Sequence, residues 1–244
     1  MPKLKVINSG KLPVLLVDGE ELLGAKQNRV LNASILLTEN SETIIPVSCT
    51  EHGRWHARQE HFTPSDAFIA KNVRARKNSS VASSLRIHRE YRSDQDQVWN
   101  DIAEVSDRLG VNSDTDAYQD TVQARIKDIQ QYIESLPCRE GQTRLLVFLS
   151  GSPVGLDIFS SPDIYRKFHA KIIRSHALDI PKQGKAGVTP SKQAATDFIG
   201  DIVKCGETAH PSVGYGTDYR CQSDRITGAA LVYGEEVIHG GFLV

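Results

Sequence analysis

Residues 29–50 read RVLNASILLTENSETIIPVSCT and contain two segments in which apolar and polar residues alternate. The first segment spans residues 29–38 and the second spans residues 44–50, with a polar stretch between them. Alternation with a period of two is typical of strands that bury one face. The sequence therefore predicts an antiparallel β-hairpin with its loop at residues 40–42.

The register of this hairpin follows from placing apolar residues opposite one another. The favoured register has three apolar pairs: Leu37 and Ile45, Ile35 and Val47, and Ala33 and Cys49. Towards the open end it predicts three further pairs: Arg29 and Gly53, Asn28 and Arg54, and Gln27 and Trp55. Two polar segments, residues 26–29 and 51–55, should therefore lie at the same end of the hairpin.

The remaining chain predicts about four helices and several more strands. Apolar residues at three- and four-residue spacing, with capping residues before them, predict helices at residues 93–110, 113–136, 161–178 and from residue 189 onward. Short apolar or alternating runs predict strands near residues 13–17, 144–149, 154–159, 219–222, 226–233 and 237–244. Residues 56–92 are polar and are expected to be irregular.

This order of elements predicts an α+β fold, a mostly antiparallel sheet with about four helices packed on one side of it. We expect residues 1–180 to form the core domain. Residues 181–244 would add a helix and C-terminal strands that complete the same domain.

Composition limits the possible partners. The 244 residues include 29 Lys and Arg against 30 Asp and Glu, a net charge of −1, so no global basic field is available for nucleic acid or an anionic membrane. The longest apolar runs reach about a quarter of the ~20 residues that span a bilayer. The N-terminus lacks the apolar run of a signal peptide, and the four widely spaced cysteines are expected to be free thiols. We therefore expect a cytoplasmic protein with no membrane partner.

The open end of the hairpin is the candidate site. It collects cations, amides and an indole that suit an anionic ligand with a flat ring, and the candidate ligand-binding residues are Lys26, Gln27, Asn28, Arg29, Arg54 and Trp55. Glu51 is the candidate acid or base. The alternative interpretation is a solvated strand end with local salt bridges.

Other patterns in the sequence suggest alternative sites but have simpler structural interpretations. Cys49 falls on the apolar face of its strand, which favours a buried structural thiol over a nucleophile. His52, His56 and His61 are spaced too widely for one metal ion if they lie on a strand, so no metal is expected. The basic stretch of residues 71–92 is either a contact for phosphates or a solvated loop, and Trp99 is expected in the core.

Several motifs resemble those of one family. Residues 19–29 read GEELLGAKQNR, residues 46–55 read PVSCTEHGRW, and residues 95–99 read QDQVW. Together they resemble the domain family that is associated with ADP-ribosylglycohydrolases and rhodanese-phosphatase proteins. Weaker similarity extends through residues 112–115, the Phe159 region and residues 174–177.

The resemblance implies a connection to NAD-derived or ADP-ribosylated substrates. The leading hypothesis is a domain that binds an ADP-ribose-type nucleotide, with Arg29, Arg54 and Lys26 on phosphates and Trp55 stacked on the base. Processing of the nucleotide is an open extension of this hypothesis. The alternative is a non-enzymatic partner or scaffold domain that acts beside such enzymes. No cofactor or protein partner is identified from the sequence.

Overall fold

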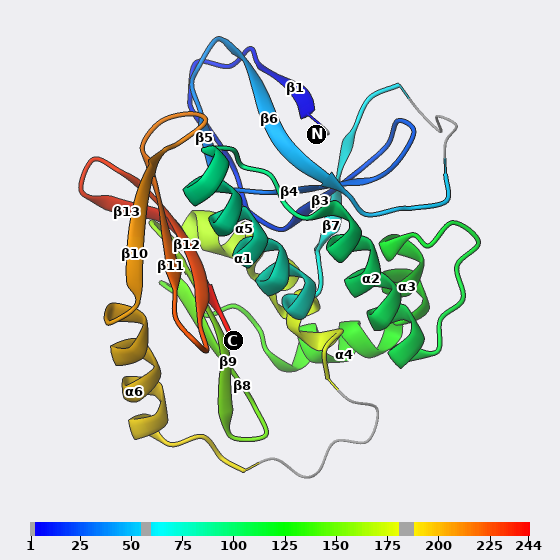
Figure 1. Cartoon of the computed structure of the whole chain (residues 1–244). Helices are drawn as coiled ribbons and strands as arrows, with labels where there is room; N and C mark the ends of the chain where they lie inside the picture. The colour runs from blue at the N-terminus through cyan, green and yellow to red at the C-terminus, as the bar shows by residue number, and fades with distance from the viewer. Residues whose placement is uncertain (1–2, 55–59, 181–187) are drawn as a thin grey trace.

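The computed structural model describes residues 3–54, 60–180 and 188–244. In these ranges the chain has an α+β fold with two larger antiparallel sheets, seen in Figure 1. The five-stranded sheet has the order β1-β6-β4-β3-β7, formed by Lys3–Asn8, Ser41–Cys49, Arg29–Leu31, Glu20–Leu23 and Thr63–Phe68. A separate two-stranded sheet pairs β2 (Val14–Leu16) with β5 (Ile35–Leu37).

The six-stranded sheet comes from the second half of the chain. Its order is β10-β11-β12-β13-β9-β8, formed by Gly206–Pro211, Thr217–Gln222, Thr227–Tyr233, Glu236–Leu243, Ser152–Phe159 and Arg144–Leu149. β13 pairs directly with β9. The strands that follow residue 188 therefore continue the sheet that β8 and β9 begin.

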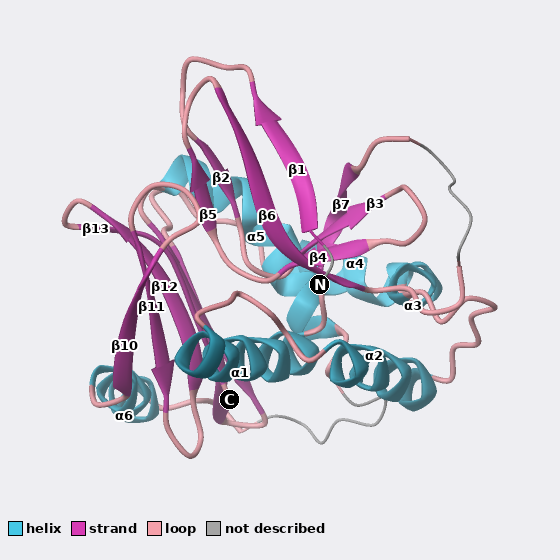
Figure 2. Ribbon diagram, turned by 45° about the horizontal axis from the view of Figure 1, so that its top comes forward, coloured by secondary structure: helices cyan, strands magenta, loops and turns pink. Residues whose placement is uncertain are grey.

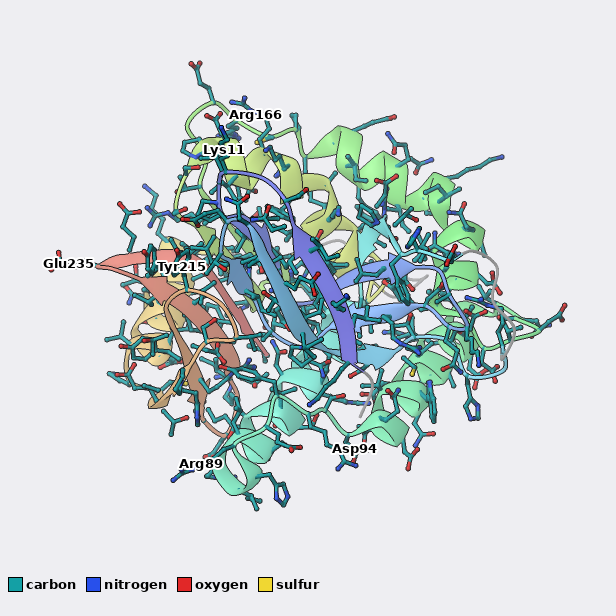
Figure 3. All side chains as sticks on the ribbon, turned by 90° about the horizontal axis from the view of Figure 1, so that it is seen from above. Lys11, Arg89, Asp94, Arg166, Tyr215 and Glu235 are labelled. Carbon is teal, nitrogen blue, oxygen red and sulfur yellow. The ribbon has the colours of Figure 1, made fainter. Side chains whose placement is uncertain are left out.

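The described residues form six helices: α1 (Lys71–His88), α2 (Gln95–Leu109), α3 (Tyr118–Ala124), α4 (Ile126–Ser135), α5 (Pro162–Ala177) and α6 (Lys192–Val203). Figure 2 shows α1 and α2 one after the other, and α1 packs against β12 and β13 of the six-stranded sheet whereas α2 packs against β6 of the five-stranded sheet. Arg89 ends α1 in the left-handed conformation and Asp94 caps α2, and both lie at the rim of the molecule in Figure 3. None of the described helices is long and apolar enough to cross a membrane.

Helices cover both faces of the six-stranded sheet, not one face as expected. Along β9, Phe159 packs against α5, whereas Leu156 belongs to a cluster with Phe198 of α6. α6 accordingly lies on the outer face of the sheet in Figure 1. Because successive side chains of a strand point to opposite faces, the apolar residues of β9 require a cover on each side.

The predicted hairpin is wrong in its pairing, although its segments are strands. β5 leaves the five-stranded sheet and pairs with β2, so that Ile35 lies opposite Leu16 and not Val47. β4 pairs with β6 at Arg29 and Cys49, four residues away from the predicted partner of Arg29. A shift by an even number of residues leaves the same side chains on the buried face, so the apolar alternation does not distinguish the two registers. Cys49 is buried and free, as predicted.

Two helical predictions also need correction. Residues 71–88, expected to be irregular, form the 18-residue helix α1. The single helix predicted at residues 113–136 is two helices, α3 and α4, that meet at Arg125. Ile126, an apolar residue of the predicted helix, is 36% exposed, while Ile129 on the same helix is buried.

Replacing Ile129 with alanine should destabilise the protein by about 2–5 kcal/mol. Its side chain is 2% exposed and belongs to the core cluster that includes Val98 and Ile102 of α2. Urea unfolding of Ile129→Ala measures the loss, and Ile126→Ala on the same helix is the matched control, for which a smaller loss is expected. Equal losses from the two variants would contradict the packing described for α4.

Candidate functional site

Four segments that are distant in the sequence meet at one end of the five-stranded sheet. They are the loop of residues 24–28, residues 50–54 after β6, the beginning of α2, and residues 113–116 before α3. The backbone N–H groups of His52 and Gly53 donate to Thr115 O at 3.2 and 2.8 Å. Thr50 N donates to Asn28 O at 3.0 Å. These bonds hold the motif segments of the sequence in one place.

Arg54 and Glu51 form a buried ion pair within this arrangement. Nε and Nη2 of Arg54 donate to Oε1 and Oε2 of Glu51 at 2.8 and 2.7 Å. The same guanidinium donates to Ala25 O at 2.6 Å and to Asn28 Oδ1 at 3.2 Å. The two charged side chains are 1% and 0% exposed. The pair therefore joins two of the segments and is enclosed by protein.

Glu51 accepts further hydrogen bonds at both of its oxygens. Thr115 Oγ1 donates to Oε1 at 2.9 Å, and Asn28 N donates to Oε2 at 3.3 Å. Burial acts to raise the pKa of Glu51, but the bonds from Arg54 and Thr115 and the charge of Arg54 hold this pKa below its ordinary value. A carboxylate held in this way accepts protons poorly. These contacts favour a positioning role for Glu51 over the acid or base role expected from the sequence.

Arg29 is half-buried and differs from Arg54 in its partners. Its Nη1 donates to Gln27 Oε1 at 3.3 Å and to Asn28 O at 3.2 Å. Its buried Nε has no hydrogen-bond partner within the part of the chain that the structure describes. Burial lowers the pKa of Arg29, and the charge of Arg54 lowers it further. An anion beside Arg29 would oppose both effects.

Helix α2 supplies a glutamine and an aromatic ring to the same region. Gln95 holds the backbone of Cys49, opposite Arg29 in the sheet, by accepting from its N–H at 2.7 Å and donating to its carbonyl at 3.0 Å. One turn later the Trp99 ring lies 4.4 Å from the imidazole of His52, centroid to centroid. Trp99 is half-buried rather than in the core as expected. The two rings place an aromatic surface beside the motif loops.

The other predicted ligand-binding residues take different positions. Gln27 and Asn28 are buried. Nε2 of Gln27 donates a hydrogen bond to the backbone oxygen of His52 at 3.3 Å. Lys26 is exposed. Trp55 lies outside the described residues. The structure thus brings the two polar segments together, as the sequence predicts, although by side-chain contacts rather than by the predicted register.

Glu21 is a buried acid beside this region that sequence reasoning missed. Its side chain is inaccessible and accepts a hydrogen bond from Thr50 Oγ1 at 2.9 Å. Burial raises the pKa of Glu21 to about 8, the bond from Thr50 lowers it and the charge of Glu51 raises it. Glu21 is therefore mostly a neutral carboxylic acid at pH 7. Only its position in the GEELLG segment marked it in the sequence.

A second polar cluster, also missed, lies between α1 and the six-stranded sheet. Asp18 accepts hydrogen bonds from Arg74 Nε at 3.2 Å and from Lys77 Nζ at 2.5 Å. Nη2 of Arg74 donates to Asp157 Oδ1 at 2.7 Å. Burial opposes the charge on Asp18, but Lys77 and Arg74 hold its pKa far below the ordinary value. Because Arg74 and Lys77 are buried and paired with Asp18, these two residues of the basic stretch are not exposed to phosphates or nucleic acid.

The cluster continues into a serine, histidine and aspartate chain. Ser34 Oγ lies 2.7 Å from His239 Nδ1, and His239 Nε2 lies 3.6 Å from Asp157 Oδ1. All three side chains are buried, and the Ser34 hydroxyl accepts a bond from Asp18 N at 3.0 Å. A hydroxyl held inside the protein in this way has no access to a substrate, so the chain is structural in this conformation. Among the described residues, no group of His, Cys, Asp and Glu is arranged to hold a metal ion.

The chain matches one family over residues 1–243, described as ARPP-1, the ARG and Rhodanese-Phosphatase-superfamily-associated Protein domain. The chain belongs to this family. The resemblance inferred from the motifs is thereby confirmed, and ARPP-1 domains are associated with ADP-ribosylglycohydrolase and rhodanese-phosphatase proteins. Neither a curated protein nor a solved structure was found to match the chain. The three segments that carry the main resemblance, residues 19–29, 46–55 and 95–99, each contribute described residues to the candidate site.

Proposed function

We propose that the ARPP-1 site binds an ADP-ribose-type or other NAD-derived nucleotide. The observation that carries the proposal is the half-buried guanidinium of Arg29, whose hydrogen bonds within the described part of the chain go to the neutral oxygens of Gln27 and Asn28. Guanidinium groups bind phosphate oxygens through paired N–H donors, and a diphosphate supplies both the charge and the acceptors. The family association with ADP-ribosylglycohydrolases supports the same ligand class.

In this proposal Arg29 holds a phosphate, with the exposed Lys26 as a second cation. The rings of His52 and Trp99, 4.4 Å apart, offer a surface for the base or the ribose. Arg54 and Glu51 do not touch the ligand but fix the loop that presents Arg29. This division differs from the role in phosphate binding expected for Arg54, because Arg54 is only 1% exposed.

The contacts of the site support binding of a nucleotide but do not identify a catalytic group. Glu51 already accepts bonds from Arg54, Thr115 and Asn28, and Glu21 is inaccessible. A role as a partner domain beside ADP-ribose-processing enzymes is the second candidate, and the family association favours it as well. Chemical conversion of the bound nucleotide by the protein would show that it is an enzyme and not only a partner domain.

NAD, ADP-ribose and their phosphorylated relatives should raise the melting temperature of the protein. A ligand present at 100 times its Kd adds about 2.7 kcal/mol to the free energy of unfolding. Differential scanning fluorimetry with this panel detects such a gain, and titration calorimetry then gives Kd. If no member of the panel shifts the melting temperature, the nucleotide proposal fails.

Arg29→Lys should raise the Kd of the bound nucleotide at least about tenfold, because hydrogen bonds to charged groups contribute about 1.5–3 kcal/mol and lysine lacks the planar fork. Calorimetry compares this variant with wild type and with Arg225→Lys, an exposed arginine in the six-stranded sheet region. Unchanged affinity in Arg29→Lys, with the fold intact by circular dichroism, would place the ligand elsewhere.

A further inference from the structure

A separate cavity of about 90 Å³ lies where α1 begins and α5 ends, beside the turn between β8 and β9. The two helix ends lie side by side in Figure 1, and Asn72 N donates to Asp179 Oδ2 at 2.8 Å between them. The polar lining comes from Lys71, Asn72, His176 and Asp179, and Phe148 forms part of an apolar wall. This volume equals that of about three water molecules, or of a ligand with four or five non-hydrogen atoms.

His176 is the feature of this cavity that requires a partner. Its side chain is more than nine-tenths buried, and neither ring nitrogen has a hydrogen-bond partner in the described ranges of the chain. Burial lowers the pKa of His176 to about 4, so the imidazole is neutral at pH 7 and carries one N–H donor. The ring packs closely on the backbone of Gly155, where a Cβ atom would come within 2.8 Å of Cε1. His176 thus lines the cavity with a donor that no described residue uses, and both of its ring nitrogens are covered by protein in this conformation.

The charges around the cavity favour an anion. The carboxylate of Asp179 is already engaged, since Asn72 donates to both of its oxygens and Arg108 Nη2 donates to Oδ1 at 2.7 Å. Lys71 is 8% exposed, and its Nζ donates to the backbone oxygen of Val244 at 2.8 Å. Arg108 offsets the charge of Asp179, so the ammonium of Lys71 is the remaining charged group of the lining.

We propose that this cavity binds a short-chain monocarboxylate. Its carboxylate would lie against Lys71 and the ring N–H of His176, and its alkyl part against the apolar wall of Phe148, Leu149 and Val154. An amphipathic ligand fits a cavity whose two sides differ in this way. The proposal does not depend on nucleotide binding at Arg29, because the two sites share no lining residue.

The test is a titration of the full chain with acetate, propionate, hexanoate, inorganic phosphate and chloride at constant ionic strength. We expect saturable binding of acetate or propionate by calorimetry, at least tenfold weaker binding of hexanoate, and no saturation with chloride. Equal affinity for phosphate would overturn the carboxylate assignment. No saturation with any carboxylate would overturn the site and leave a cavity that holds only water.

Variants localise the binding. Lys71→Met and His176→Leu should each weaken propionate binding at least tenfold, while Lys127→Met, an exposed lysine on α4, should leave it unchanged. Arg29→Lys should also leave it unchanged, which separates this site from the nucleotide site. Where a variant does not fold, the ¹⁵N resonances of the wild-type His176 ring serve instead. Ring resonances that do not move while propionate saturates the protein would overturn the assignment.

Discussion

Arg54→Met should destabilise the protein by about 3–5 kcal/mol, because it leaves the carboxylate of Glu51 buried without its counter-charge. Both side chains are enclosed, and the guanidinium donates to both oxygens of Glu51. Urea unfolding at pH 7 measures the loss. Arg225→Met, at an exposed arginine, is the control and should change the free energy of unfolding by less than about 0.5 kcal/mol.

A second variant separates the ion pair from the volume of the side chain. Arg54→Lys keeps the positive charge but loses the planar fork, so it should destabilise the protein less than Arg54→Met does. The double variant Glu51→Leu with Arg54→Met removes both charges and should recover part of the stability lost by Arg54→Met alone. A double variant less stable than both single variants would contradict the view that the unpaired charge causes the loss.

The ion pair between Arg54 and Glu51 fixes the conformation of the loops that carry the motifs. Since Arg54 also donates to Ala25 O and Asn28 Oδ1, its loss would release the loop that ends at Arg29. Preorganised loops bind ligands with a smaller loss of conformational entropy. Buried motif residues can therefore support binding without touching the ligand. In the proposed site this role belongs to Arg54 and Glu51, and contact with the phosphate belongs to Arg29.

Elements with an apolar stripe and ordinary caps could be predicted from the sequence. Ser161 caps α5 by accepting from Ile164 N, with Pro162 at the first helical position, as its sequence indicates. β8 and β9 likewise form where strands are predicted, near residues 144–149 and 154–159. In these elements the local signal and the tertiary contacts agree, so residue pattern alone is sufficient.

Helix α1 could not be predicted because its buried face is charged. Arg74 and Lys77 occupy positions where the apolar pattern of a helix would require hydrophobic residues, and both are paired with Asp18. Pattern reasoning assigns such a segment to solvent, since basic side chains are rarely buried unless they are paired. The partner Asp18 lies 56 residues earlier than Arg74 in the chain, and only the fold brings the two together.

The sequence predicted which segments form the candidate site, but not which of their side chains are buried. The motifs correctly gathered residues 26–29 and 51–54, because they flank strands of one sheet. The division between buried and accessible cations depends on tertiary contacts, such as those that the loop of residues 24–28 makes with Arg54, and the sequence pattern does not supply these contacts. Trp99 illustrates the same limit: its place on α2 follows the apolar stripe, but its ring meets His52 of a distant loop.

Glu21 should make the protein less stable as the pH rises from 5 to 8. Its pKa is about 8 in the folded protein against an ordinary value of 4.5, so the folded state binds more protons than the unfolded state between these values. The contribution of the neutral acid is complete below pH 4.5 and is lost as the pH rises through 8. The difference in pKa corresponds to about 4–5 kcal/mol over this range.

Glu21→Gln removes this titration and should therefore flatten the dependence of stability on pH. The variant and wild type should have similar free energies of unfolding near pH 5, and the variant should gain on wild type by up to about 1.4 kcal/mol for each pH unit towards pH 8. Urea unfolding of both proteins at pH 5, 6, 7 and 8 gives the two curves. The comparison of slopes is the deciding measurement, because the amide of glutamine changes the hydrogen bond with Thr50 equally at every pH.

Glu42→Gln is the matched control, since it removes a carboxylate from the same five-stranded sheet at a side chain that is 62% exposed. Its curve should run parallel to that of wild type between pH 5 and pH 8, because an exposed carboxylate interacts only weakly with its surroundings. If Glu21→Gln also runs parallel to wild type, Glu21 is ionised in the folded protein. A second buried anion would then lie beside Glu51 in the region of Arg29, and this added negative charge would weaken the case for a bound anion there.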